Sequence, residues 1–362
     1  MQRKTNINIK LIHNIMKRLK LFLLATLMII SSLTFAQEKK EEKKVDRTPK
    51  ISGFVQTLYQ ADFNKDFKLS TNTFRMRRVR MSIEGKLTED LSYKIQGDFV
   101  RSPMLVDAFV KYKICDAFAI QVGQYKLPFT METAINPVNL EIYDYGEVIS
   151  KLVGYNDVCG VGALGRDMGI MATGKAFEQE DYHLLEYAVG VFNGNGVNNT
   201  DANNRKDVAG RVEFHPWMKE VTLTGSFYLG KYKKDDNTFG DRNRYSGGAQ
   251  FKNERLVVRS EFVAGDTGVN DTVSNYNTNG LYAVVGYNFF LGKEKKQSLM
   301  PVLRYDRFDR DTNIEKGAYN LFTAGVNYWP FKCLNCKLDY TYIKPESGDA
   351  SHRIVAILSY KF

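Results

Sequence analysis

Basic side chains recur on one face of alternating segments in this 362-residue sequence. In residues 74–87, FRMRRVRMSIEGKL, Arg78 and Arg80 alternate with apolar residues, and Arg75 and Arg77 stand at the start of the same stretch. Rows of guanidinium and ammonium groups replace part of the hydration shell of an anion, and Arg offers phosphate a two-pronged donor geometry. These residue types predict a path for small anions. Further bases on the polar face of such segments are Lys94, Lys111, Arg211, Arg244, Arg259, Arg304, Lys337 and Arg353.

Acidic residues share this face, so ion pairing with a neighbouring segment is the simpler interpretation of any single base. The longest irregular segment, residues 127–165, is also acidic and has Lys151 as its main base, which argues against phosphate selectivity. The acids of the alternating face are Glu84, Asp98, Asp107, Glu213, Glu261, Asp306 and Asp339, and those of the irregular segment are Glu132, Glu141, Asp144, Glu147 and Asp157.

Motifs of catalysis and of metal binding are missing from the sequence. It contains no G-x-S-x-G elbow, no H-E-x-x-H and no P-loop, so we expect neither an enzyme nor a cofactor. Cys333 and Cys336 stand in a predicted turn, where they form either a disulfide or two free thiols. A zinc site there needs two further ligands, which the positions of Cys115 and Cys159 do not supply.

The first 36 residues have the organisation of a secretory signal. A basic start precedes the apolar run LFLLATLMII and a small-residue ending at Ala36. Translation begins at Met1 or at Met16, since a complete signal also follows Met16. Residues 37–50 are dense in charge and predict a solvated tether. Six of the 51 Lys and Arg residues lie in the signal, which leaves 45 against 41 acidic residues, a net charge of +4 that gives no case for nucleic acid.

From residue 51 to residue 362 the chain alternates apolar and polar residues in sixteen segments of about ten residues. A water-soluble sandwich would also show this alternation. Three features favour a transmembrane β-barrel: export, an aromatic content of 13% with 21 Tyr and 23 Phe, and the final alternating strand IVAILSYKF, which ends on Phe362. Sixteen is also an even number of strands, as a closed bacterial barrel requires.

The connections between these segments are alternately short and long. Short turns such as KLTED and FKNE would lie on the periplasmic side, and the Asn-, Gly- and Asp-rich connections on the outer side. Residues 127–165 are by far the longest connection. Because sixteen strands enclose a water-filled lumen, we expect this segment to fold inward and narrow it.

Six motifs occur in an order that resembles the phosphate-selective porin O and P family, over about residues 51–362. They are FRMRRVRMSIEGKL, VDAFVKY, QVGQYKLPFTMET, GRDMGIMATG, EYAVGVFNGNG and KDVAGRVEFHP. The resemblance implies an all-β, 16-stranded antiparallel transmembrane β-barrel that forms a homotrimer. It also implies that the third outer loop is the constriction, and that Lys126 stands at the root of that loop and faces the passage.

The predicted function is that of a diffusion porin in the outer membrane of a Gram-negative bacterium, surrounded by outer-membrane lipid. It would prefer anions and pass phosphate or similar small anions. Two alternatives stay open: a weakly selective porin for small organic solutes, and a surface-binding barrel whose pore is closed. Ion-selectivity recordings in planar bilayers separate the three.

Overall fold

The computed structural model describes residues 45–161, 164–201, 203–233, 238–267, 276–292, 294 and 296–362. The chain divides into two units, and the second, residues 47–362, contains all the strands given below. The predicted signal and residues 37–44 of the predicted tether lie outside the described residues. Residue 50, assigned to the tether, already belongs to the first strand. Among the described residues, no helix has the length and apolar character that a membrane crossing needs.

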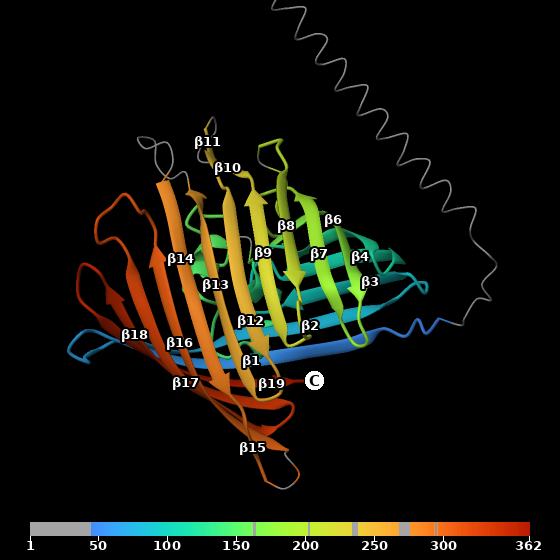
Figure 1. Cartoon of the computed structure of the whole chain (residues 1–362). Helices are drawn as coiled ribbons and strands as arrows, with labels where there is room; N and C mark the ends of the chain where they lie inside the picture. The colour runs from blue at the N-terminus through green and yellow to red at the C-terminus, as the bar shows by residue number, and fades with distance from the viewer. Residues whose placement is uncertain are drawn as a thin grey trace, which may run out of the picture. The chain divides into compact units, whose positions relative to one another are not determined.

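Sixteen long strands build one continuous wall, as predicted (Figure 1). They are β1 (Lys50–Phe63), β2 (Leu69–Lys86), β3 (Leu91–Asp98), β4 (Leu105–Cys115), β5 (Phe118–Lys126), β6 (Arg166–Glu178), β7 (His183–Phe192), β8 (Asp207–Phe214), β9 (Val221–Leu229), β12 (Arg244–Lys252), β13 (Leu256–Thr267), β14 (Tyr276–Tyr287), β16 (Gln297–Asp309), β17 (Tyr319–Phe331), β18 (Leu334–Pro345) and β19 (Ser351–Lys361).

Each wall strand pairs antiparallel with the wall strands before and after it in the chain. The wall closes because β1 pairs with both β2 and β19, with Phe54 opposite Lys361 and Phe63 opposite His352 at the two ends of the seam. The backbone of Phe362 extends this seam through two hydrogen bonds with Gly53. A closed barrel leaves no unpaired sheet edge, which satisfies the backbone polar groups that lipid cannot.

Side-chain burial follows the alternation that the sequence predicts. On β19, Leu358 and Tyr360 point outward with 46% and 45% exposure, whereas Val355 and Ile357 point inward with 1% and 3%. The inward residues are covered although they face the lumen of a wide barrel. They pack, together with Leu58 of β1, against Tyr143 of the long loop between β5 and β6.

Three short strands supplement the wall. β15 (Phe289–Leu291) continues the line of β14 and pairs with the start of β16. β10 (Lys231–Lys233) and β11 (Phe239–Asp241) form a separate antiparallel hairpin in the connection between β9 and β12. The periodicity of the sequence did not distinguish this hairpin from an irregular loop.

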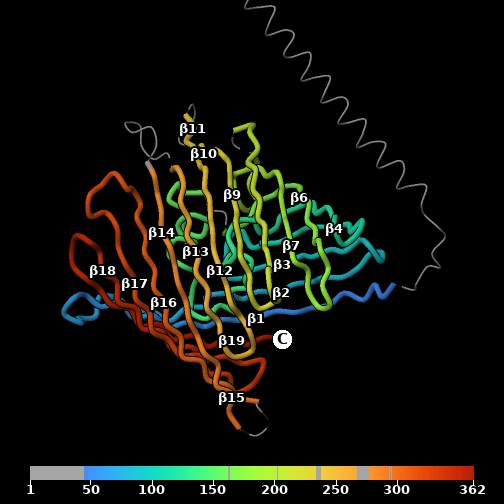
Figure 2. Tube along the Cα trace, viewed as in Figure 1, coloured from blue at the N-terminus to red at the C-terminus, as the bar shows by residue number. Residues whose placement is uncertain are grey.

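The connection between β5 and β6 is a folded segment. It contains α2 (Met131–Ala134), the 3-10 helix η1 (Pro137–Asn139) and α3 (Glu147–Leu152), and we call residues 127–165 the inner loop. Phe129, Val148 and Ile149 of this loop are buried against inward side chains of the wall such as Tyr228 and Tyr282. The inner loop therefore lies against the inside of β9 to β16, where Figure 2 shows it as the green trace behind β12 and β13.

Candidate functional site

The acidic residues of the inner loop meet the arginines of the wall. Asp157 lies 2.6 Å from Arg244 and 3.1 Å from Arg242, measured between carboxylate oxygen and guanidinium nitrogen. All three side chains are essentially fully buried. Arg244 also donates to the backbone carbonyl of Leu152, at the end of α3. This cluster fixes the second half of the loop to the start of β12.

A second cluster fixes the first half of the loop. Arg259 on β13 lies 2.6 Å from Glu141 and 3.5 Å from Glu132. Arg304 on β16 is 2.8 Å from Asp306 and 3.7 Å from Glu132. Buried ions need such partners, because an unpaired buried charge costs several kcal/mol.

A third cluster joins the middle of the loop to β2. Asp144 lies 2.6 Å from Arg77 and 3.6 Å from Arg78, and Arg78 also donates to Gln56 on β1 at 3.1 Å. The pairing of β1 with β2 shifts register between Gln56 and Thr57. Because Arg77 is adjacent to this shift, it contacts the carboxylate of Asp144, as does its inward-facing neighbour Arg78.

Acidic side chains of the wall also bind the inner loop, because they accept hydrogen bonds from its backbone N–H groups. Glu261 accepts from Met131 at 2.8 Å, Asp306 from Glu147 at 2.9 Å and Asp339 from Tyr143 at 2.8 Å. Two of these N–H groups begin a helix, where a carboxylate is favourable because the first turn leaves its N–H groups free.

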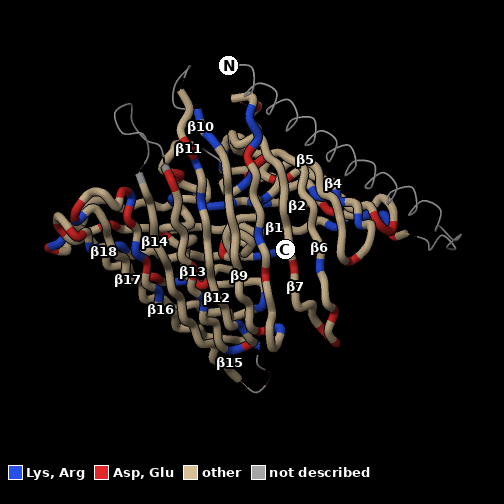
Figure 3. Tube along the Cα trace, turned by 45° about the horizontal axis from the view of Figure 1, so that its top comes forward, with Lys and Arg blue, Asp and Glu red and all other residues tan. Residues whose placement is uncertain are grey.

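The geometry separates the basic residues that the sequence predicted for the anion path into two groups. Arg77, Arg78, Arg244, Arg259 and Arg304 are occupied by the inner loop. The loop acids that pair with them are the same acids that the sequence analysis counted against anion selectivity. Because these bases and acids neutralise each other, neither group contributes a free charge to the rest of the lumen. Whether these arginines take part in anion passage stays a prediction. Figure 3 shows basic and acidic residues distributed along the strands of the wall.

The pairing of Asp157 gives a pH prediction. Burial by itself raises the pKa of Asp157, but Arg244 and then Arg242 outweigh it, so the pKa lies well below its ordinary value of 3.8. A lowered pKa stabilises the folded state above the ordinary value, and this contribution is lost only as the pH falls through the lowered one. We expect Asp157→Asn to destabilise the barrel by about 3 kcal/mol.

That difference should be the same at neutral pH and at pH 3.8, where an ordinary aspartate would be half protonated. Thermal unfolding of both proteins in detergent measures it. Equal stability of the two proteins at neutral pH would show that Asp157 titrates normally and that the two arginines do not hold it ionised.

The second group of bases lines two cavities on the inner wall between β3 and β8. The first cavity, of about 290 Å³, is lined by Lys94 and Lys126 together with Arg80 and Arg166. Arg80 is paired with Asp98 at 2.9 Å and Arg166 with Asp107 at 2.6 Å. Both arginines of this cavity are thus paired with a carboxylate, and the two lysines are the bases that remain.

Lys126 stands at the root of the inner loop. Its ammonium group donates to the carbonyls of Thr133 at 2.7 Å and Ile135 at 2.9 Å, so it closes the first turn of the loop. It forms no ion pair with any described residue. Lys94 is 3.4 Å from Glu84, and both side chains are partly exposed. The first cavity therefore has one basic side chain, Lys126, that pairs with no carboxylate of the described residues.

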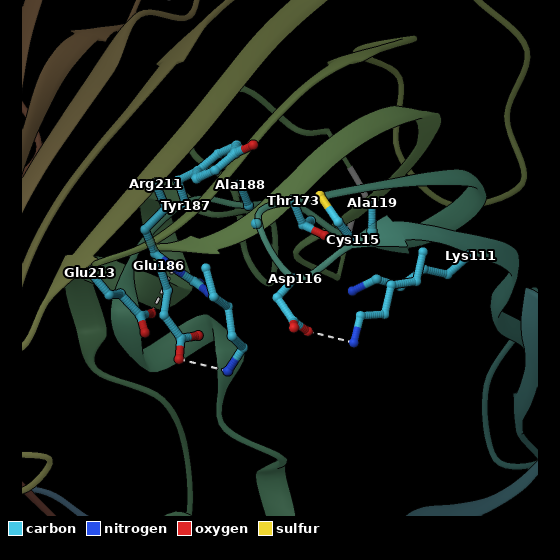
Figure 4. Close-up of a pocket in the computed structure, with 13 residues that line it drawn as sticks. Lys111, Cys115, Asp116, Ala119, Thr173, Glu186, Tyr187, Ala188, Arg211 and Glu213 are labelled. Atoms are coloured by element: carbon cyan, nitrogen blue, oxygen red, sulfur yellow. Dashed lines mark hydrogen bonds and ion pairs between the residues drawn. The ribbon is translucent and has the colours of Figure 1, made fainter. Parts of the chain in front are cut away.

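The second cavity, of about 360 Å³, adjoins the first, because Gln121 of the first is the register partner of Lys111 of the second. Figure 4 shows its charged side chains. Three bases are paired: Lys113 with Asp116 at 2.5 Å, Lys175 with Glu186 at 2.7 Å and Arg211 with Glu213 at 2.9 Å.

Lys111 is the fourth base of this cavity. Its ammonium group makes no ion pair with any residue that the structure describes. The second cavity, like the first, thus has an excess of one basic side chain. Arg75 lies in neither cavity: it is exposed on β2 and donates to Gln60 at 3.3 Å.

Among the basic residues of the interior that sequence reasoning missed, four bear on these sites. Lys113 and Lys175 line the second cavity, Arg166 lines the first, and Arg242 binds Asp157. Lys113 stands two positions after Lys111, so the alternation could have found it. Arg166 and Arg242 are at or next to strand ends, where the alternation does not predict whether a side chain points inward or outward.

All four cysteines are free thiols in the structure, so the possible disulfide between Cys333 and Cys336 is not formed. Cys336 lies one position after the inward-facing Asn335 and one before the inward-facing Lys337, which turns its side chain away from the lumen. In the part of the chain that the structure describes, no three His, Cys, Asp or Glu side chains converge to hold a metal ion.

The closed wall with charged side chains inside and an apolar exterior defines an outer-membrane porin. Solved structures support this class of fold. An anion-selective porin from Comamonas acidovorans has a TM-score of 0.64 at 11% identity, over 88% of this chain and 100% of that one. The outer-membrane channel DcaP of Acinetobacter baumannii has a TM-score of 0.60 at 12% identity, over 89% and 99%. OmpT of Vibrio cholerae in a trimer form has a TM-score of 0.56 at 11% identity, over 87% and 99%.

The chain belongs to the family described as phosphate-selective porin O and P, whose sequence model matches residues 50–255 and 235–354. The comparison with curated protein sequences found no match. The protein is thus an outer-membrane channel of a Gram-negative bacterium.

Proposed function

We propose that this porin prefers anions and passes phosphate or similar small anions along the inner wall between β3 and β8. The observation that carries the proposal is the pair of adjoining cavities in which Lys126 and Lys111 have no carboxylate partner among the residues that the structure describes. Positive charge on a low-dielectric wall concentrates anions, and weak single contacts allow them to leave. The family description and the anion-selective porin from Comamonas acidovorans support the same preference.

The residues of this path are Lys94, Lys111, Lys126 and Arg211. Arg211 is 18% exposed and pairs with Glu213, and it also donates to the carbonyl of Thr130 in the inner loop at 2.9 Å. It therefore borders both the loop and the second cavity. Arg80 contributes to the first cavity while it is paired with Asp98.

A second candidate is a weakly selective porin for small organic solutes. Three of the four bases in the second cavity have an acidic partner, and such a mixed surface suits zwitterionic solutes as well as anions. Planar-bilayer recordings separate the two. Anion-directed reversal potentials with block of chloride current by millimolar phosphate support the proposal, and conductance without either supports the second candidate. No conductance at all would support a surface-binding barrel instead.

Lys111→Glu tests the path itself. At 4 Å in water each unit of charge changes the energy of an ion by about 1 kcal/mol, or roughly fivefold in local concentration. We expect the chloride-to-potassium permeability ratio to fall by at least roughly 25-fold, because the substitution reverses the charge beside the passage and so changes it by two units. Lys65→Glu is the control, since Lys65 is exposed, pairs with Asp349 and lies in the connection between β1 and β2. An unchanged ratio in Lys111→Glu would place the anion path elsewhere.

Two further proposals concern the mature protein. We propose that export removes residues 1–36, which amino-terminal sequencing of the protein from outer membranes would test. We also propose that the barrel forms a homotrimer, in line with the trimer form of OmpT. Mass measurement of the detergent-solubilised protein would identify the assembly, and a monomer would exclude it.

A further inference from the structure

The outer wall of the barrel has an apolar depression of about 520 Å³ across β14, β16, β17 and β18. Its floor includes Ala283 and Ala324, and its rim includes the rings of Tyr305, Phe322 and Tyr342. Ala324 stands opposite Leu303 on one side and Tyr340 on the other, and Ala283 stands opposite Tyr305. Two methyl side chains between much larger neighbours produce a hollow where the wall would otherwise be even.

The rim is an ordered row of rings. The centroids of Tyr305 and Phe322 are 5.1 Å apart, and those of Phe322 and Tyr342 are 6.5 Å apart. The hydroxyl of Tyr305 donates to Asn320 at 2.7 Å, toward the outer end of the wall. Amphipathic rings in this orientation are typical of a membrane–water interface, so the depression begins at the outer interface and extends into the hydrocarbon layer.

Two basic residues lie directly above the rings. Arg307 follows Tyr305 by two positions and Lys344 follows Tyr342 by two, which places both about 7 Å nearer the outer loops on the same face. Asn320 is the register partner of both. Arg307 contacts Glu346 at 2.7 Å with 37% of its side chain exposed, and Lys344 makes no hydrogen bond or ion pair with any described residue. Positive charge is thus available at headgroup depth above an apolar hollow.

We propose that this depression and the basic row above it bind one lipid of the outer leaflet that carries an anionic phosphate headgroup. An acyl chain fills the hollow, and the phosphate contacts Arg307 and Lys344. Lipid tails are as apolar as the hollow, so selection among lipids depends on the headgroup. Basic residues near the membrane surface attract anionic headgroups, which predicts selection for anionic lipid over zwitterionic lipid.

The test uses the full-length mature protein in detergent, titrated with dioleoylphosphatidylglycerol or dioleoylphosphatidylcholine and followed by native mass spectrometry. We expect one phosphatidylglycerol to bind at least roughly tenfold more tightly than phosphatidylcholine. The double variant Arg307→Ala with Lys344→Ala should remove this preference, and Lys65→Ala, in an outer connection, should keep it. Ala324→Phe, which fills the hollow, should weaken the binding of phosphatidylglycerol while the channel conductance stays unchanged.

Several results would overturn the proposal. Equal binding of the two lipids, or full binding by the double variant, would exclude the headgroup contact. Unchanged binding by Ala324→Phe, or displacement of the lipid by millimolar inorganic phosphate, would mean that a phosphate alone is recognised and that no chain occupies the hollow. If Ala324→Phe instead alters the ratio of trimer to monomer and no lipid binds, a second copy of the chain covers the depression. Conductance of each variant confirms that it is folded, and none of these outcomes depends on anion preference.

Discussion

Replacing Arg259 with methionine should detach the first half of the inner loop and give a larger, noisier single-channel conductance. Arg259 is 1% exposed and is the only base within 3 Å of Glu141 among the described residues. Its loss leaves Glu141 and Glu132 buried without their main counterion. Removing one partner of a buried ion pair costs about 3–5 kcal/mol, because the other charge stays in a low-dielectric site.

The loop has two ways to relieve this cost: it can take up protons, or it can move its carboxylates into water. Burial raises the pKa of Glu141, and Arg259 reverses this and holds it below the ordinary value. Without Arg259 the pKa of Glu141 should rise, so the noise in the current should diminish as the pH is lowered and the carboxyl becomes neutral.

Two control variants distinguish loss of the ion pair from loss of packing. Arg259→Lys keeps the charge and should restore most of the original conductance. Lys252→Met removes a base that lies 3.8 Å from Glu141 with 47% of its side chain exposed, and it should have little effect. If Arg259→Met keeps the conductance and noise of the unaltered protein, the ion pairs do not hold the loop.

Local alternation was sufficient to predict the wall of this porin. On β19, Ile354, Ala356, Leu358 and Tyr360 were expected on one face, and the exposure of Leu358 and Tyr360 agrees with this. Alternation predicts a barrel well because a strand has only two faces and each strand pairs with its neighbour in sequence. Sixteen short local patterns therefore determine both the number and the order of the strands.

The contacts inside the lumen could not be predicted in the same way. Glu132 and Arg259 are 127 positions apart, and their meeting depends on how the inner loop folds. From residue types and spacing alone, each loop acid could lie equally well against a wall arginine or in open water. Counting the loop acids thus led to the expectation of an acidic constriction, whereas the structure neutralises Glu132, Glu141, Asp144 and Asp157 against bases of the wall.

Irregularities in the wall limit the sequence argument in another way. Strict alternation makes Arg77 the outward neighbour of Arg78, but the register shift beside Gln56 and Thr57 brings both to Asp144. A bulge adds one residue to one strand and re-aims the side chains next to it. No pattern of residue types in β2 marks that position, so only the three-dimensional pairing could reveal it.

Leu338→Arg should prevent stable insertion of the barrel. Leu338 lies near the middle of β18, is 52% exposed and points outward, opposite Val326 on β17 and Ala356 on β19. An arginine on the lipid face of a barrel costs about 2–4 kcal/mol near the bilayer midplane, because its charge has neither water nor a counterion there. This is a large part of the net stability of about 5–15 kcal/mol that folded proteins have.

The measurement is unfolding by urea in phospholipid vesicles. Samples are run on a gel without heating, and the unfolded chain is detected by its slower migration. Leu338→Phe keeps an apolar side chain at the same position and should unfold at the same urea concentration as the unaltered protein. Lys94→Arg changes the side chain of a base that faces the water-filled cavity, and it should also be neutral. The three variants lie at two positions, and only Leu338→Arg places a charge on the outer face. An equal loss of stability in all three variants would therefore contradict the assignment of the outer face to lipid.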